Sequence, residues 1–320
     1  LTMKNKLKSC AILATLGTIT IHLINKTLIE MATKDSLLNS SEGNYYDWRF
    51  GKIYYRKQGN GKPLLLLHDL DAESSGVEWK KVAAILAEKH TVYTVDLLGC
   101  GRSEKPNITY TNFLYVELIT NFIKHIIGEK TDVIVSGESC PFVLMACAND
   151  DSIINKVVMI NPPNLVKMAK IPTKASKLFK KLIFTPVIGT FIYNLNVNKK
   201  TILQKFIFSY YYAQNDIKER DILTYFESSH KDHTHSKYLY ACQKSRYLNA
   251  NIVHCLSRLT NSIYIIVGNS NPENILAANE YQNYLPSIEI KGIAKAKQMP
   301  HMEKPEEFFS DVKIFLSDAQ

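Results

Sequence analysis

The sequence predicts an α/β fold in which a mostly parallel central sheet is covered by helices on both faces and carries an inserted helical cap. Short apolar, β-branched segments alternate with segments of helical spacing over residues 45–160 and again over 262–317. This alternation is typical of parallel strands joined by helices. Between the two regions, residues 163–250 are helical in pattern, aromatic and basic, which predicts an insertion.

The first part of the sheet follows from apolar runs bounded by turn residues. Pro63 is followed by four leucines, and such a run is typical of a strand buried on both faces. Val82, Ile85 and Leu86 then have helical spacing. The elements expected in this part are strands at 45–49, 52–56, 63–67, 91–95, 131–135 and 157–160, and helices at 78–88, 112–127 and 142–148.

The α/β pattern resumes after the insertion. We expect a strand at 262–267, a helix at 272–284, a strand at 287–290 and a final helix near 305–317. The chain then divides into an N-terminal basic and apolar segment with a linker (1–40), a core (41–162 and 251–320) and a cap (163–250). A chain of 320 residues, 46% of them hydrophobic, can bury a core of this size.

The positive charge of the chain is concentrated in the cap. The net charge is +9, and residues 163–250 hold 15 Lys and Arg against 5 Asp and Glu. After Pro172, one helical face carries five apolar residues and the other carries four lysines (Ala175, Leu178, Phe179, Leu182, Ile183; Lys174, Lys177, Lys180, Lys181). Such a helix can lie on an anionic membrane surface or simply cover a core with a solvated lysine face. We expect no nucleic-acid partner.

The N-terminal segment has the composition of a membrane anchor. Lys4, Lys6 and Lys8 precede sixteen residues, 9–24, without Asp, Glu, Lys or Arg. This run is shorter than an ordinary span of about 20 residues and longer than a usual signal-peptide apolar region. We favour an uncleaved anchor over a packed helix or a cleaved signal. The lysines before it would place the main domain outside the cytoplasm.

The cysteines and histidines predict no metal site and no cofactor. Six cysteines show neither a C-x-x-C pair nor metal-ligand spacing (10, 100, 140, 147, 242, 255), so buried thiols are the simpler interpretation. His230, His233 and His235 form the one histidine cluster, and a polar loop explains it more simply than zinc does.

Residues 133–142 predict a nucleophile elbow. A β-branched run enters Gly137-Glu-Ser-Cys-Pro141 and continues into an apolar helix pattern, which matches the strand, sharp turn and helix around G-x-S-x-G. Ser139 is therefore the candidate nucleophile, and the backbone N–H groups of Cys140 and Leu70 are the candidate oxyanion donors. Pro141 replaces the last glycine, and proline suits the first turn of a helix.

Together these motifs make residues 45–317 resemble the α/β-hydrolase fold, in its single-cap branch of esterases, haloalkane dehalogenases and epoxide hydrolases. The motifs occur in the family's order: the strand before His68-Asp69, Trp79 in the next helix, the D-x-x-G-x-G-x-S loop at 96–103, the elbow, and a C-terminal stretch at 299–308 similar to P-H-x-E-x-P-E-x-F. The resemblance implies a serine hydrolase of ester or lipid-like substrates.

The positions that the resemblance assigns to catalysis depart from the family pattern. Asn271 stands where the acid follows the strand at 262–267, and Asn161 stands at the alternative acid position. Gln298 stands where the catalytic histidine is expected, and His301 matches a second, non-catalytic histidine. Asp69 replaces the glycine of the oxyanion loop. Replacing a triad aspartate by asparagine lowers turnover about 10⁴-fold in a serine protease.

Three functions are compatible with the sequence. The first is a serine hydrolase in which Ser139 attacks an ester and His301, or else His68 or His254, acts as base. The second is a weak or inactive pseudoenzyme that binds an apolar or anionic ligand at a membrane. The third is a partner-binding module that uses the aromatic residues at 206–212, although packing explains these more simply. We favour the first narrowly over the second.

Overall fold

The central sheet has eight strands in the order β1-β2-β4-β3-β5-β6-β7-β8. The structure, a computed structural model, describes residues 3–39 and 42–317. The strands are β1 (Asn44–Trp48), β2 (Gly51–Gln58), β3 (Lys62–Leu67), β4 (His90–Val95), β5 (Thr131–Ser136), β6 (Ile154–Ile160), β7 (Ser262–Gly268) and β8 (Glu289–Ile293). β2 runs antiparallel to β1 and β4, and the other pairs are parallel. The predicted fold class is confirmed.

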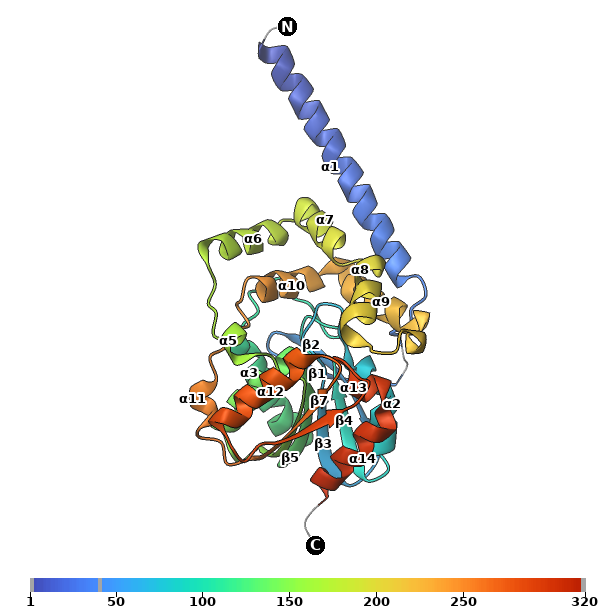
Figure 1. The fold of residues 1–320 in the computed structure, drawn as a ribbon. Helices are drawn as coiled ribbons and strands as arrows, with labels where there is room; N and C mark the ends of the chain where they lie inside the picture. The colour runs from blue at the N-terminus through green and yellow to red at the C-terminus, as the bar shows by residue number, and fades with distance from the viewer. Residues whose placement is uncertain (1–2, 40–41, 318–320) are drawn as a thin grey trace.

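The helices cover both faces of this sheet and form a separate group between β6 and β7 (Figure 1). They are α1 (Met3–Thr33), α2 (Lys80–Leu86), α3 (Asn112–Phe122), α4 (Cys140–Asn149), α5 (Leu165–Met168), α6 (Lys174–Phe184), α7 (Val187–Asn196), α8 (Lys199–Lys205), α9 (Glu219–Thr234), α10 (Ser236–Lys244), α11 (Val253–Leu256), α12 (Pro272–Tyr284), α13 (Pro300–Glu303) and α14 (Pro305–Leu316). The expected helix at 112–127 is α3 extended by a π-helical turn, Ile123–Ile127.

The leucine run of β3 explains how the core is built. Leu65 and Leu67 pack in the cluster that includes α3 and α4, whereas Leu64 and Leu66 pack in the cluster with α2 and α14. Alternate side chains of a strand point to opposite faces, so both faces of β3 are buried. With β4 on one side and β5 on the other, β3 lies where the chain order of the sheet reverses. Ligands of open α/β sheets bind beside such a point, at the carboxyl ends of the strands.

The helices from α6 to α10 lie over this end of the sheet as a cap with its own apolar cluster (Figure 1). The cap cluster is rich in aromatic residues, among them Tyr193, Phe206 and Tyr225. Thr173 begins α6 with a capping box, and the lysines of α6 are on its solvent side or half-buried. The aromatic stretch at 206–212 is divided: Phe206, Tyr210 and Tyr211 are buried, whereas Phe208 and Tyr212 are exposed.

α1 projects away from the body of the molecule (Figure 1). Residues 8–20 are all exposed, whereas Asn25 and Ala32 are buried against the cap. Asn25 donates to the Val187 carbonyl (3.0 Å) and accepts from Asn194 (3.0 Å). From Lys8 to Thr33 the helix is long and apolar enough to cross a membrane, a property that signal sequences share.

Candidate active site

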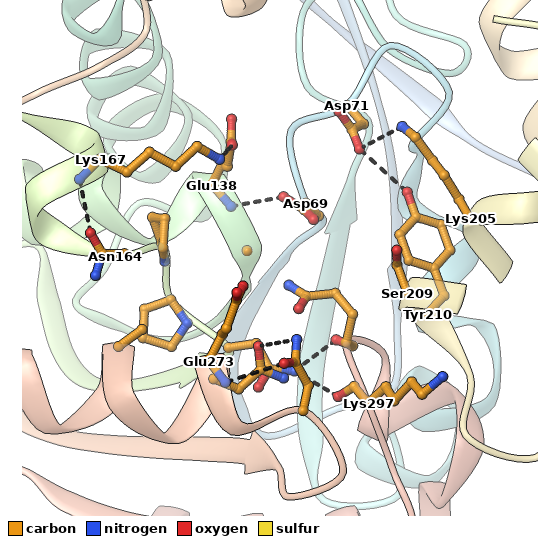
Figure 2. A pocket seen from close by; sticks show the side chains of 18 of the residues that line it. Asp69, Asp71, Glu138, Asn164, Lys167, Lys205, Ser209, Tyr210, Glu273 and Lys297 are labelled. Atoms are coloured by element: carbon orange, nitrogen blue, oxygen red, sulfur yellow. Dashed lines mark hydrogen bonds and ion pairs between the residues drawn. The ribbon is translucent and has the colours of Figure 1, made fainter. Parts of the chain in front are cut away.

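A cavity of about 650 Å³ opens between the carboxyl ends of the parallel strands and the cap. The loops after β3, β5, β6, β7 and β8 contribute Asp69, Gly137, Asn161, Asn271 and Gln298 to its wall. Figure 2 shows side chains that line it. Topology alone therefore brings together residues that are far apart in the sequence.

Charged and amide side chains dominate the wall of this cavity. Four carboxyl groups lie there with four lysines and six carboxamides (Asp69, Asp71, Glu138, Glu273; Lys167, Lys205, Lys244, Lys297; Asn161, Asn164, Asn271, Asn274, Gln243, Gln298). Opposite charges are paired: Lys167 contacts Glu138 at 3.0 Å, and Lys205 contacts Asp71 at 3.2 Å. The formal charge of the wall is therefore balanced.

The strained residue of the turn after β5 is Gly137. β5 continues through Ser136, and among residues 136–140 only Gly137 has a positive φ, at 54°. A Cβ atom at this position would lie 2.1 Å from Cγ of Asp69. Both the left-handed backbone and the close carboxylate therefore require glycine here.

Ser139, the candidate nucleophile, does not reach the cavity. Ser139 has helical backbone angles (φ −79°, ψ −18°), is fully buried and is not part of the cavity wall. Its hydroxyl donates to the His68 carbonyl at 2.7 Å. Because the strand reaches Ser136, the sharp turn falls two residues before Ser139, which lies at the start of the following helix.

The carboxylate of Asp69 occupies the backbone donors of this turn. Its Oδ1 accepts from the N–H of Leu70 (2.8 Å) and from the N–H of Glu138 (2.7 Å). The N–H of Cys140, the second predicted oxyanion donor, bonds instead to the Gly137 carbonyl. Both predicted oxyanion N–H groups thus already have acceptors within the chain.

The surroundings of Asp69 also disfavour its charged form. Burial, followed by the negative charges of Asp71 and Glu138, raises the pKa of Asp69 well above its ordinary value. Two residues away the effect is opposite: burial would raise the pKa of Asp71, but Lys205 and Lys244 lower it to about 2. The pKa values of these two neighbouring carboxyl groups are therefore shifted in opposite directions.

His301, the candidate base, lies against the core. Its ring stacks on Trp79 with centroids 4.5 Å apart, and its Nε2 is 3.5 Å from Glu78. Neither ring nitrogen has a hydrogen-bond partner, so no hydrogen bond joins it to Ser139. His68 accepts from the Leu97 N–H at 2.9 Å through Nε2, and its Nδ1 contacts the Asp69 carbonyl. His254 is exposed on α11.

The two asparagines at the acid positions have structural partners. Asn271 caps α12 by accepting from the Glu273 N–H at 3.2 Å. Asn161 donates to the carbonyls of Lys297 and Gln298 and accepts from the Gly268 N–H at 3.1 Å. Gln298 is half-buried in the cavity wall. Asn161, Asn271 and Gln298 thus meet beside Gly137, as their motif positions imply, but Ser139 does not join them.

A salt-bridge cluster between cap and core was not predicted from the sequence. Lys205 of α8 contacts both Asp71 and Glu73, and the Tyr210 hydroxyl also donates to Asp71 at 3.3 Å. Gln243 of α10 donates to Asp71 and Glu138, both at 2.9 Å. Burial would lower the pKa of Lys205, but Asp71 and Glu73 raise it. Two features of the sequence could have suggested this cluster: the excess of basic residues in the cap, and the two acids, Asp71 and Glu73, that follow Asp69.

Metal-ligating groups do not gather here. Among residues 3–39 and 42–317, no three His, Cys, Asp or Glu side chains are close enough to hold a metal ion. Cys100, Cys140, Cys147 and Cys242 are free and buried. Burial raises the pKa of the Cys140 thiol well above its ordinary value, so this thiol is unreactive.

Comparisons with known proteins agree with this architecture. Residues 62–305 match the family model described as alpha/beta hydrolase fold. The chain is 29% identical over 182 residues to a soluble epoxide hydrolase from Corynebacterium sp. (strain C12), covering 54% of this chain and 62% of that enzyme. The match thus spans less than two thirds of that relative's length.

Among solved structures, a membrane phospholipase A, a bacterial virulence factor, is similar with a TM-score of 0.67 and 18% identity, covering 98% of both chains. A carboxylesterase from Bacillus subtilis has a TM-score of 0.64 and 16% identity, covering 94% of this chain and 100% of that one. At these identities the likeness concerns the fold.

Proposed function

This chain belongs to the α/β-hydrolase fold family, and on that premise we propose that it is a pseudoenzyme that uses the family's pocket to bind a polar ligand. In this proposal Gly137 stands at the nucleophile position of the elbow. The N–H groups of Leu70 and Glu138 are then the family's oxyanion donors, because the second donor belongs to the residue after the nucleophile.

The bond pattern of Asp69 carries the proposal. An oxyanion hole stabilises a transition state only when its donors are free to meet the developing charge. Here the Asp69 Oδ1 lies 2.8 Å and 2.7 Å from the two backbone nitrogens. A substrate oxygen would have to displace the Asp69 carboxyl oxygen, which is part of the same chain, from both of these N–H groups.

The other groups near the pocket offer no replacement for the missing chemistry. Ser139 without a base is close to an ordinary alcohol, and loss of nucleophile or base costs about 10⁶ in turnover in subtilisin. Asp69 is a poor nucleophile because burial raises its pKa, which disfavours the charged form, and because its Oδ1 already accepts two backbone N–H groups. The Asn271 and Gln298 side chains carry no charge and cannot act as acid and base at this pH.

The wall of the cavity supports a polar ligand rather than the apolar or anionic one expected from the sequence. Two of its four lysines, Lys167 and Lys205, already pair with the carboxylates of Glu138 and Asp71, which leaves little excess positive charge for an anion. Carboxamides both donate and accept hydrogen bonds, and the volume of about 650 Å³ suits a small molecule. An uncharged or zwitterionic compound rich in hydroxyl or amide groups fits this wall best.

A labelling experiment tests the absence of catalysis. We expect purified full-length chain to hydrolyse nitrophenyl butyrate no faster than its Ser139→Ala variant and to remain unlabelled by a fluorophosphonate. Labelling of the wild type at Ser139, with an ester rate that Ser139→Ala abolishes, would show a working serine hydrolase and overturn the proposal.

A rebuilt site tests the assignment of Gly137. Gly137→Ser requires Asp69→Gly, because the new Cβ would otherwise lie 2.1 Å from the carboxylate. Adding Asn271→Asp and Gln298→His restores the family's acid and base. We expect fluorophosphonate labelling at position 137 in this variant and none in Asp69→Gly alone.

We also propose that α1 anchors the chain in a membrane with the main domain outside the cytoplasm. The hydroxyls of Thr15, Thr18 and Thr20 each donate to a carbonyl four residues earlier at 2.9 Å, so these polar groups are satisfied inside the helix, as lipid requires. Lysines precede the apolar run and favour the cytoplasmic side.

Fractionation tests the anchor. Full-length chain should sediment with membranes and a chain lacking residues 1–20, which keeps Asn25 and the cap contacts, should not. Equal solubility of the two would reject the anchor, and protection of the folded domain from protease added outside the cell would reject the proposed side.

A further inference from the structure

A second cavity, also of about 650 Å³, lies where α1 passes the cap. One wall is α1, another is the start of α7, and the third is the turn between α9 and α10. Five basic side chains line it and one carboxyl group accompanies them (His22, Lys26, His233, His235, Lys237; Glu30). This balance differs from that of the cavity beside Gly137, where lysines and carboxyl groups are equal in number.

We propose that this second cavity binds the phosphate-type head group of an anionic ligand. The argument rests on where the turn at the end of α9 places the Asp232 carboxylate, on the buried amine of Lys237, and on the position of the cavity along α1. It is independent of the binding proposed for the Gly137 cavity.

The left-handed turn at the end of α9 places the Asp232 carboxylate outside the second cavity. Asp232, His233 and Thr234 have positive φ angles of 56°, 57° and 65°, which non-glycine residues seldom adopt in succession. The Asp232 carboxylate pairs with buried Lys105 at 2.9 Å, in a different cavity. His233 lines the second cavity, and His235, whose ring centroid is 6.3 Å from that of His233, lines both this cavity and the one that holds Asp232.

Lys237 adds a buried amine to the same cavity, and burial lowers its pKa to about 8. It is 2% exposed, and its Nζ donates to the Thr185 carbonyl (2.8 Å) and the Thr190 hydroxyl (3.0 Å). No carboxylate pairs with it among the residues described, and a buried ammonium is costly without a counter-ion. An anion in the cavity would supply the missing negative charge.

The remaining walls suit an amphiphile. Ile29, Val187 and Tyr238 give the cavity an apolar side. On α1, His22 and Lys26 lie one and two turns beyond Ile19, which is 51% exposed, so they share its face. A lipid beside α1 would thus place its chains along the exposed apolar helix and its head group at His22 and Lys26.

A metal ion is a poor occupant of this cavity. Its three histidines do not approach closely enough to ligate one ion, since no metal-competent group occurs in the part of the chain that the structure describes. Cationic head groups would meet the amines of Lys26 and Lys237 and be repelled. The chemistry therefore favours an anion with several acceptor oxygens.

The proposal is tested by titrating full-length chain in dodecyl maltoside with dihexanoyl phosphatidic acid, dihexanoyl phosphatidylcholine and inorganic phosphate. We expect saturable binding of phosphatidic acid, at least tenfold weaker in His233→Asn/His235→Asn. Asparagine tolerates the left-handed backbone at His233, so this variant keeps the turn. Exposed His254→Asn is the matched control and should bind like the wild type.

The three ligands separate the sources of the anion. Phosphate that binds as tightly as phosphatidic acid and competes with it would assign the site to a free anion, whereas phosphatidic acid alone would assign it to a lipid head group. Equal binding of phosphatidylcholine, no binding of any anion, or equal affinity in the double variant and the wild type would overturn the proposal. Circular dichroism of each variant confirms folding before the titration.

Discussion

Asp69→Asn should stabilise the protein increasingly as the pH rises. In the wild type the pKa of Asp69 is raised by burial and by Asp71 and Glu138, so the folded state holds a proton that the unfolded state releases above a pKa of about 3.9. A group of this kind loses stability as pH rises between its unfolded and folded pKa values. Asparagine keeps the Oδ1 acceptor for Leu70 and Glu138 and has no proton to lose.

The size of this effect follows from the linkage slope. Each pH unit inside that window lowers the free energy of unfolding of the wild type by about 1.4 kcal/mol relative to the variant. For a chain of this length, one pH unit at full slope corresponds to roughly 3 °C in the midpoint of thermal unfolding.

The assay is thermal unfolding followed by circular dichroism, in detergent, at pH 5, 6, 7 and 8. Asp150→Asn, just after α4, is the control, because hydrogen bonds from Lys124 and Ser152 lower the pKa of Asp150 to about 2. Its charge does not change between pH 5 and pH 8, so the difference between this variant and the wild type should be constant over this range. Parallel curves for wild type and Asp69→Asn would refute the reasoning about Asp69.

Three further predictions concern single contacts. Ser139→Ala should cost about 1 kcal/mol of unfolding free energy, the value of its bond to the His68 carbonyl; a larger loss in a denaturation curve would contradict a role limited to that bond. Arg102→Met should cost about 3–5 kcal/mol, because it leaves buried Asp96 without its bidentate partner at 2.7 and 2.9 Å; an unchanged thermal midpoint would contradict it. Asn25→Ala leaves the Val187 carbonyl and Asn194 unpaired and should cost about 1–3 kcal/mol, visible as faster hydrogen exchange in α7 but not in α3.

The fold could be predicted because its signals are local. The leucines after Pro63 predict a strand buried on both faces. The structure confirms this, because these leucines pack alternately in two core clusters on opposite faces of the sheet. The motif order then fixed which loops meet, so Asn161, Asn271 and Gln298 do share one cavity.

The elbow shows where such signals stop. Gly137 satisfies two patterns: it can be the first glycine of G-x-S-x-G or the strained residue of the turn itself. Only the length of β5 separates the two, because the strand ends at Ser136 and the left-handed angle follows at once. A one-dimensional motif match favoured Ser139, whereas the need for glycine at a positive φ would have favoured Gly137.

The contacts across the cap were beyond sequence reasoning for a different reason. Asp69 was recognised as a departure from glycine, but the direction of its carboxylate depends on the N–H groups of two separate loops. Lys205 reaches Asp71 over more than a hundred residues of chain. No spacing rule relates these positions, since the packing of the cap on the sheet determines their approach.

The docking of α1 has a mechanical consequence. The helix packs on the cap: Asn25 bonds to α7, and Glu227 of α9 accepts from the N–H groups that follow α1, at 3.3 Å from that of Leu38. If α1 is held in a bilayer, the cap is the stationary part of the molecule. The pocket beside Gly137 would then open by movement of the sheet away from the membrane. Such a movement would have to break the salt bridges of Lys205 with Asp71 and Glu73, which join the cap to the core.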